Sequence, residues 1–240
     1  MREAAARLLP SDPRARLTCA LALAFGFASV RDVALVPAIA ALALGVTLAA
    51  GEPRETLRRM RGPALLALAF VAILPLVSGS TVLWEAGPVR LRAEGLEAGL
   101  LIGGRLVSIV AVTLALLAPV SPMRLAAALR GLGVPAAMAD LALLTLRYVE
   151  ELRGEIARVR LARRLRGGRD GWRGVGEHGL MLAALVIRSQ RRSERIWAAM
   201  RLRGYDAIAA PPPALGARDR AATALAAAIG IVIFLMGASP

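Results

Sequence analysis

The sequence predicts an all-α, polytopic integral membrane protein with a long cytosolic segment of arginine-rich helices. Three observations support this fold class. Of the 240 residues, 57% are hydrophobic but only 4% are aromatic, and the excess is Ala, Leu and Val in long runs. The 31 basic residues, all of them arginine, outnumber the 17 acidic ones and give a net charge of +14. Most of these arginines lie between the apolar runs, as in the cytoplasmic loops of membrane proteins.

Five apolar runs are predicted to be helices because they are long and lack the alternation of a strand. They cover residues 17–30, 33–50, 63–83, 96–117 and 221–236. The first run is about 21 Å long as a helix, less than the roughly 30 Å of hydrocarbon in a bilayer. It crosses only with tilt or with snorkelling of Arg14 and Arg16, so whether it fully spans is left open. A basic loop, residues 54–61, precedes the third run, and a polar stretch, residues 84–94, precedes the fourth.

The arginine-rich loops orient these helices. They lie before the first run, between the second and third, and between the fourth and last, so an even alternation of spans places all of them in the cytoplasm. We therefore expect a multi-pass protein of the cytoplasmic (inner) membrane, in contact with the lipid bilayer. The expected parts are a cytosolic N-terminus (1–16), four membrane helices (17–119), a cytosolic helical region (120–218) and a last membrane helix with the C-terminus (219–240).

The cytosolic region concentrates the positive charge, because residues 119–220 hold 19 of the 31 arginines. Helices are predicted at residues 123–132, 135–166 and 177–203. The last two begin apolar and become arginine-rich, a pattern that suits helices leaving the bilayer interface for the cytoplasm. A glycine-rich connector, residues 167–176, separates them, and three consecutive prolines at 211–213 form a stiff spacer.

The two long cytosolic helices end in similar sequences. ARVRLARRLRG (157–167) and ERIWAAMRLRG (194–204) are identical at six of eleven positions. Both carry the pattern Ala-x-x-x-Arg-Gly, which comprises Ala162, Arg166 and Gly167 in the first copy and Ala199, Arg203 and Gly204 in the second. Four further arginines support these helices, namely Arg158, Arg164, Arg195 and Arg201.

Such a helix end is suited to insertion into a protein groove. A small Ala permits close approach, a terminal Arg offers a planar fork of five donors, and Gly allows the chain to leave the helix in a left-handed conformation. The structural alternative is that Arg and Gly simply favour helix C-termini. Ala126–Gly131 matches the same pattern, so it is the eleven-residue similarity that favours a functional role.

These features resemble the transmembrane T component of energy-coupling factor (ECF) transporters, particularly the cobalt-type family. The resemblance covers nearly the whole chain and includes Asp12-Pro13-Arg14, Gly133-Val134-Pro135, Leu146-Arg147-Tyr148 and the stretch from Arg192 to Tyr205. It implies that Arg166 and Arg203 anchor in the grooves of two ABC-type ATPase subunits. Gly167 and Gly204 would end the helices there, and Ala162 and Ala199 would allow close approach. It also implies a separate substrate-binding membrane subunit (an S-component-like protein), with cobalt or nickel as the cargo and a vitamin as the alternative.

Several other chemistries are disfavoured. A P-loop needs a lysine, and the chain has none. We therefore expect that this chain has no enzyme activity and that its partner subunits hydrolyse ATP. With His178 and Cys19 as the single histidine and cysteine, the chain offers neither a soft-metal site nor a nucleophile and base pair, and no cofactor is expected. Nucleic acid is not an expected partner, because few exposed aromatics accompany the arginines.

Two alternatives are kept: a self-contained membrane carrier or channel, and a membrane-anchored anion-binding protein. Polar residues inside the apolar runs bear on the first alternative. Arg105 lies inside the fourth run and is expected to snorkel or to pair with Glu97. Asp140 is expected to pair with a nearby arginine such as Arg147. We expect Trp197 to pack between the two long cytosolic helices.

Overall fold

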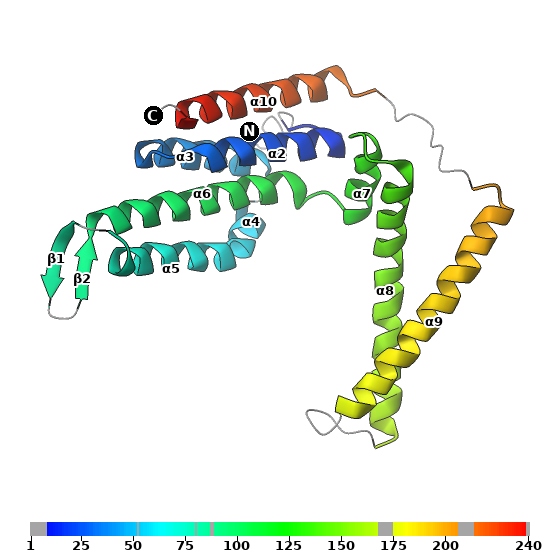
Figure 1. Cartoon of the computed structure of the whole chain (residues 1–240). Coiled ribbons are helices and arrows are strands. Elements are labelled where there is room, and N and C mark those ends of the chain that lie inside the picture. The colour runs from blue at the N-terminus through cyan, green and yellow to red at the C-terminus, as the bar shows by residue number, and fades with distance from the viewer. Residues whose placement is uncertain are drawn as a thin grey trace. The chain divides into compact units, whose positions relative to one another are not determined.

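The computed structural model describes residues 9–51, 53–79, 81–86, 89–167, 175–205 and 214–238. The chain forms two units, Met1–Ala128 with Pro213–Pro240, and Leu129–Pro212 (Figure 1). In the chain the second unit therefore interrupts the first, and the boundary falls inside helix α7 (Pro122–Arg130).

Each of the five predicted apolar runs corresponds to a helix of the first unit. These are α2 (Pro13–Ser29), α3 (Val36–Ala49), α5 (Arg61–Val77), α6 (Ala93–Leu117) and α10 (Ala217–Ala238). One turn of 3-10 helix, η1 (Val33–Leu35), precedes α3. The basic loop expected at residues 54–61 is instead the short helix α4 (Pro53–Arg59), which begins with a proline and has Arg58 and Arg59 in its last turn. Both features favour a helix at those positions.

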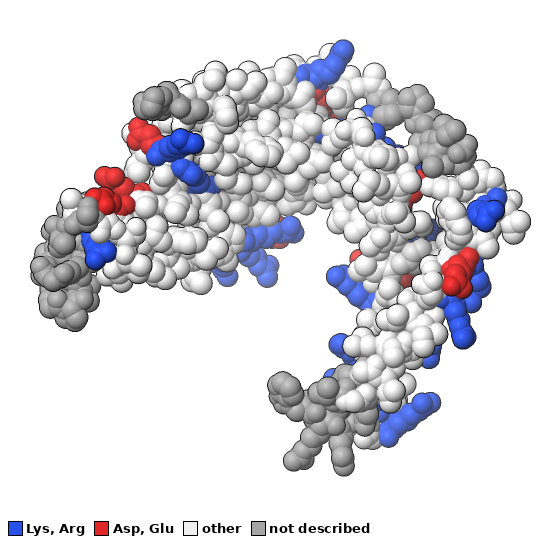
Figure 2. Space-filling view, viewed as in Figure 1, with Lys and Arg blue, Asp and Glu red and all other residues white. Residues whose placement is uncertain are grey.

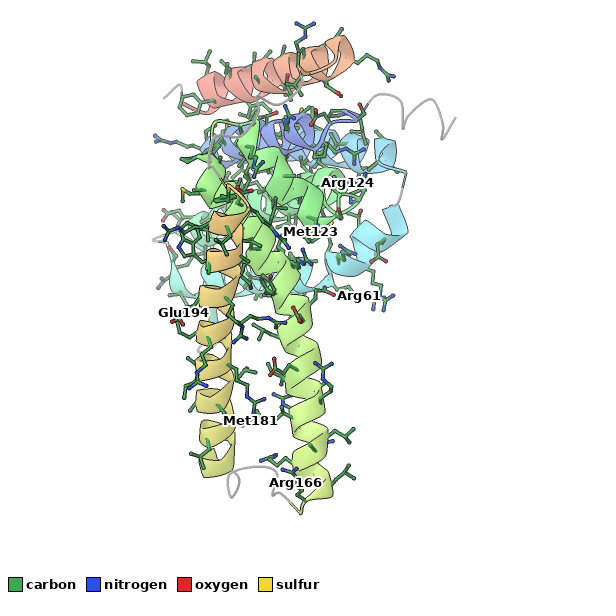
Figure 3. All side chains as sticks on the ribbon, turned by 90° about the vertical axis from the view of Figure 1, so that its right-hand side faces the viewer. Arg61, Met123, Arg124, Arg166, Met181 and Glu194 are labelled. Atoms are coloured by element: carbon green, nitrogen blue, oxygen red, sulfur yellow. The ribbon has the colours of Figure 1, made fainter. Side chains whose placement is uncertain are left out.

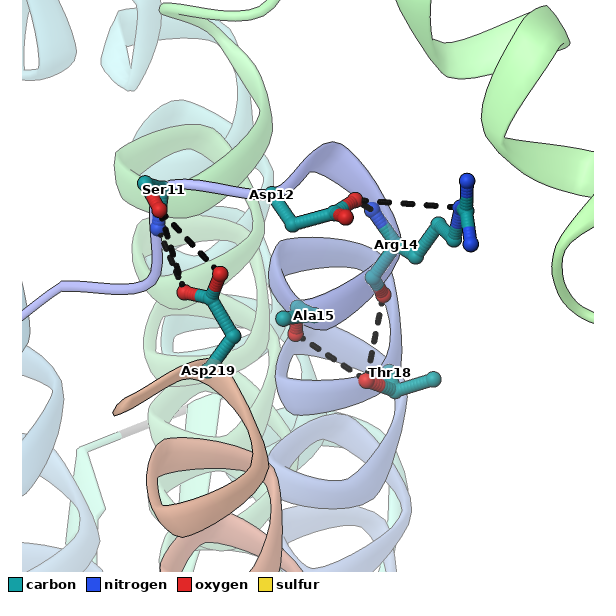
Figure 4. A network of polar contacts seen from close by, with 6 residues as sticks. All are labelled: Ser11, Asp12, Arg14, Ala15, Thr18 and Asp219. Atoms are coloured by element: carbon teal, nitrogen blue, oxygen red, sulfur yellow. Dashed lines mark hydrogen bonds and ion pairs between the residues drawn. The ribbon is translucent and has the colours of Figure 1, made fainter. Parts of the chain in front are cut away.

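Helix α2 begins at a polar network that joins the two chain segments of this unit (Figure 4). Asp12 caps the helix by accepting a hydrogen bond from the Arg14 amide at 2.9 Å. The next residue, Pro13, has the fixed φ of a first helical position. Beside it, the buried carboxylate of Asp219, in the first turn of α10, accepts hydrogen bonds from the Ser11 amide at 2.8 Å and from the Ser11 hydroxyl at 3.1 Å.

Helices α2 and α10 pack in parallel through small residues. Ser11 meets Asp219, the Cys19 thiol lies 3.6 Å from the Ala222 carbonyl oxygen, and Gly26 faces Gly230. A Cβ built on Gly230 would lie 2.6 Å from the Ala22 carbonyl oxygen, which only glycine avoids. Small residues of this kind let helix backbones approach closely in membrane proteins. Together with α3 and α6 these two helices enclose a core whose largest fully buried side chains are Phe27, Val30, Val112 and Ser108.

Helix α6 packs on α5 by a similar device. Gly95, Gly99 and Gly103 follow at intervals of four residues along α6, so they share one face. Cβ atoms built on them would meet the α5 backbone, for example 3.0 Å from the Val71 Cα at Gly99 and 3.2 Å from the Ala67 carbonyl oxygen at Gly103. The close contact between α5 and α6 therefore requires glycine, which has no side chain, at these three positions.

A hairpin between α5 and α6 departs from the sequence prediction. The predicted helix 63–83 ends at Val77, and β1 (Val82–Ala86) pairs antiparallel with β2 (Val89–Arg92) before α6 starts at Ala93. The helix ends because Ser78 is extended and Gly79 adopts φ +120°. The Arg92 guanidinium donates to the Val77 carbonyl at 3.0 Å and so holds the hairpin to the end of α5.

The all-α class with membrane character is confirmed apart from this hairpin. Within the described ranges, α6 and α10 are long and apolar enough to cross a membrane, whereas Val33–Ala49 and Arg61–Val77 are shorter apolar helices. Many large apolar side chains of this unit point outward, including Leu65, Leu68, Leu225, Ile231 and Phe234. Such a surface suits lipid better than water.

The second unit contains two long helices, α8 (Ala136–Leu165) and α9 (Val175–Leu202), and Figure 1 shows α9 running obliquely to α8. Their bounds differ from the predicted 135–166 and 177–203 by at most two residues. The helices are antiparallel, because Arg188 pairs with Glu155 at 3.4 Å while Arg192, one turn later, pairs with Glu151, one turn earlier.

Candidate functional site

The end of α9 is a glycine-dependent cap. Gly204 has φ +70°, its amide donates to the Arg201 carbonyl at 3.0 Å, and the Tyr205 amide donates to the Met200 carbonyl at 3.0 Å. These two bonds are those of a Schellman motif, in which the residue at the Gly position must be left-handed. Arg203 therefore stands at the tip of the helix, with its amide still bonded to the Ala199 carbonyl at 3.2 Å.

The end of α8 repeats this geometry. Gly167 has φ +78° and its amide donates to the Arg164 carbonyl at 3.1 Å, the same pairing that Gly204 makes. All six signature residues are exposed, as are the four supporting arginines. We call Ala162, Arg166 and Gly167 the first tip, and Ala199, Arg203 and Gly204 the second tip. The similarity seen in the sequence is thus a similarity of backbone conformation.

The third match to the pattern has a different structure. In Ala126–Gly131 the alanine is buried, and Gly131 is not left-handed. The turn after α7 is capped instead at Gly133, with φ +88° and a hydrogen bond from the Val134 amide to the Leu129 carbonyl at 3.2 Å. The pattern alone therefore does not define the exposed Arg-Gly end, and the third match serves packing.

The two tips lie at opposite ends of the antiparallel pair. Figure 3 shows Arg166 at the far end of α8, near the start of α9, where Met181 lines the same groove. Because α9 has 28 residues, its rise of 1.5 Å per residue separates the tips by about 40 Å. Charged side chains gather along both helices, whereas the visible stretch of α10 between its ends is white in Figure 2.

The expected ion pair of Asp140 with an arginine is confirmed, but the arginine is not the one named from the sequence. The Asp140 carboxylate forms an ion pair with Arg130 and accepts a hydrogen bond from the Tyr205 hydroxyl at 2.8 Å. Arg147, the example chosen from the sequence, is exposed and is not this partner. Seven residues along a helix are about 10 Å, whereas the turn at Gly133 returns Arg130 to the start of α8.

Trp197 is only partly a packing residue. Its side chain is 55% exposed, and its ring meets that of Tyr205 edge-on at 6.3 Å between centroids. It lines a mainly apolar groove of about 560 Å³ between α8 and α9, together with residues such as Leu144, Tyr148 and Met200. A second groove of about 540 Å³ includes Ala162, Arg166 and Gly167 of the first tip.

Two further predictions concerned an ion pair between Arg105 and Glu97 and the absence of a metal site. Arg105 does not pair with Glu97; its Nε is buried without a hydrogen-bond partner among the described residues. Eight residues along a helix, about 12 Å, are too many for a direct pair. In the part of the chain that the structure describes, no group of three His, Cys, Asp or Glu side chains could hold a metal ion.

Comparison with known proteins identifies the family. No curated protein matches the chain. The family model described as cobalt transport protein, CbiQ, matches residues 8–212, a range that contains both tips and the Asp140 network. The chain therefore belongs to the CbiQ cobalt transport protein family, which is the family of ECF T components.

Proposed function

We propose that this chain is the transmembrane coupling subunit, or T component, of an ECF-type ABC importer. Two separate ATPase subunits hydrolyse ATP, and this chain, itself without enzymatic activity, transmits their motion to a separate substrate-binding membrane subunit. Membership in a cobalt transport family supports a transition-metal cargo, cobalt or nickel. The observation that carries the proposal is the pair of exposed Arg-Gly caps on antiparallel helices.

The spacing of the tips supports two ATPase subunits rather than one. The tips are about 40 Å apart, the length of a helix of this size, so each needs a groove of its own. The exposed guanidinium groups of Arg166 and Arg203 can each form paired hydrogen bonds with a carboxylate in such a groove. A left-handed Gly directly after each Arg keeps the tip narrow.

The packing of α2 and α10 supports five crossings of the bacterial inner membrane. In a bundle whose spans alternate in direction, the first and the fifth run in parallel, as these two helices do. With the arginine-rich loops in the cytoplasm, α2 and α10 would both cross the membrane from the cytoplasmic side to the outside. The exposed apolar side chains of α5 and α10 would then be available to lipid and to the substrate-binding subunit.

Charge reversal at the tips tests the proposal. Arg203→Glu should abolish recovery of the ATPase subunits with the affinity-tagged protein, and Arg166→Glu should reduce it, because a carboxylate groove would repel the new charge. Arg160→Glu and Arg191→Glu are matched controls, since they reverse arginines of α8 and α9 that are also exposed but lie outside the signatures. Uptake of radioactive cobalt and nickel by the same cells identifies the cargo.

The outcomes separate the candidate functions. If all four variants recover the ATPases like wild type, the tips are not the anchors. If all four lose them equally, net charge rather than the tips is responsible. A wild-type protein that transports without any ATPase would instead be a self-contained carrier, and one that recovers nucleic acid would be an anion-binding protein.

A further inference from the structure

The second tip is tied to the rest of its unit by one carboxylate. Tyr205 directly follows Gly204, and it is fixed at two points: its amide bonds the Met200 carbonyl of α9, and its hydroxyl bonds Asp140 Oδ2 at 2.8 Å. The other carboxylate oxygen, Oδ1, pairs with the Arg130 guanidinium. Asp140 thus joins the end of α9, the start of α8 and the last residue of α7.

This junction is partly shielded from water. The side chain of Asp140 is 17% exposed and that of Arg130 is 34% exposed, and the Nε of Arg130 is buried without a hydrogen-bond partner in the described residues. Ion pairs and hydrogen bonds are stronger where less water competes for them. A displacement of Gly204 that leaves these bonds intact therefore moves Asp140 and Arg130 with it.

Helix α7 connects this junction, along the chain, to residues of the first unit. It runs from Pro122 to Arg130 and crosses the boundary between the two units after Ala128. Its last residue holds Asp140, and its first residues belong to the first unit. A rigid helix transmits a push or a rotation along its axis, whereas a flexible loop would absorb it.

We propose that Asp140 is a positioning residue that links movement of the second tip to α7, with Tyr205 and Arg130 as its two partners. This inference rests on the proposed function, because the movement is supplied by an ATPase bound at the tip. In the absence of the link, the ATPase still binds Arg203 and still hydrolyses ATP, but less of its motion reaches the first unit.

The test uses the purified importer, tagged on this chain and reconstituted in proteoliposomes. Tyr205→Phe removes only the hydroxyl and keeps the aromatic contact with Trp197 and the cap at Gly204. Asp140→Asn removes the charge and keeps the shape. Tyr148→Phe is the matched control, since this tyrosine contacts Arg192 through its ring, 5.5 Å from the guanidinium carbon. For each protein the recovered ATPases, the rate of ATP hydrolysis and the metal ion transported per ATP are measured.

We expect Tyr205→Phe and Asp140→Asn to retain the ATPases and their hydrolysis. The ion transported per ATP should fall at least about fivefold, the lower range of coupling between linked sites. Tyr148→Phe should transport like wild type, and Arg130→Asp combined with Asp140→Arg should recover part of the loss. An unchanged ratio of transport to hydrolysis in both single variants would overturn the inference and leave the proposed function intact. A wild-type protein that recovers no ATPase would overturn both.

Discussion

Gly26 of α2 and Gly230 of α10 face each other so closely that a Cβ on Gly26 would lie 2.9 Å from the Cα of Gly230. This distance is shorter than any that real Cβ contacts adopt, so the two helix backbones have no space for a side chain at their crossing. Among the described residues, the contact also joins the first and the last helix of a unit whose chain is interrupted by the second unit.

The first prediction concerns this crossing. Gly26→Ala or Gly230→Ala should force the helices apart and lower the stability of the protein in detergent by about 1–3 kcal/mol, the usual cost of overpacking. The temperature at which helical circular dichroism is lost measures the effect. Gly45→Ala in α3 is the control, because its Cβ would meet no atom within 4 Å. Equal effects at all three positions would show that the crossing is not tight.

Second, glycines of the two long helices should respond to alanine with opposite signs. Gly204→Ala and Gly167→Ala place an L side chain in a left-handed conformation, which costs about 1–2 kcal/mol, and the helix ends should fray. Gly154 lies inside α8, and the Cβ that alanine adds there would lie 3.6 Å from the Arg158 side chain, an ordinary contact. Gly154→Ala should therefore stabilise the helix by about 0.5–1 kcal/mol. Amide exchange at the helix ends and thermal unfolding together measure both effects, and a stabilising Gly204→Ala would exclude the Schellman cap.

A third prediction addresses the network of Figure 4. Asp219→Ala removes the acceptor of the Ser11 amide and hydroxyl, and hydrogen bonds to a charged group contribute about 1.5–3 kcal/mol. Trypsin should then cut faster at Arg14 and Arg16. Asp32→Ala is the comparison, because that exposed aspartate caps only the 3-10 turn through the Ala34 amide at 2.9 Å. Should both variants be cut at the wild-type rate, the Asp219 contact does not hold this segment.

The two ion pairs between α8 and α9 should differ in strength. Arg192 is 37% exposed and also lies over the Tyr148 ring, whereas Arg188 is 65% exposed. A double-mutant cycle on Glu151 and Arg192 should give a coupling energy near the upper end of the roughly 0.2–1 kcal/mol found for exposed pairs, and that on Glu155 and Arg188 one near the lower end. Chemical unfolding at low and high salt provides the measurement, and the reverse order would mean that exposure and ring contact do not set the strength.

Local signals in the sequence predicted much of this structure. The apolar runs located α6 and α10, and the glycines at 167 and 204 located the ends of α8 and α9, because a left-handed cap is a preference of single residues. The hairpin was missed because Val82 and Leu83 extend an apolar run. The signal for it was available in Val89-Arg90-Leu91-Arg92, whose apolar and polar residues alternate as in a strand.

Contacts between distant parts of the chain could not be predicted in this way. Asp140 and Tyr205 are separated by 65 positions, and nothing in the spacing of their neighbours relates one to the other. The burial that distinguishes Ala126 from Ala162 and Ala199 likewise arises only from tertiary packing. Matching tips could therefore be proposed from the sequence, but not the residues that hold the second tip in place.

The parallel contact of α2 with α10 also imposes an order on synthesis. The ribosome completes α2 at Ser29, but α10 begins only at Ala217. At about 5–20 residues per second, the glycine face of the first helix waits on the order of ten seconds or more for its partner. Gly26 therefore meets its final neighbour last, and whatever covers this face before then, lipid or an earlier segment of the same chain, is replaced when α10 arrives.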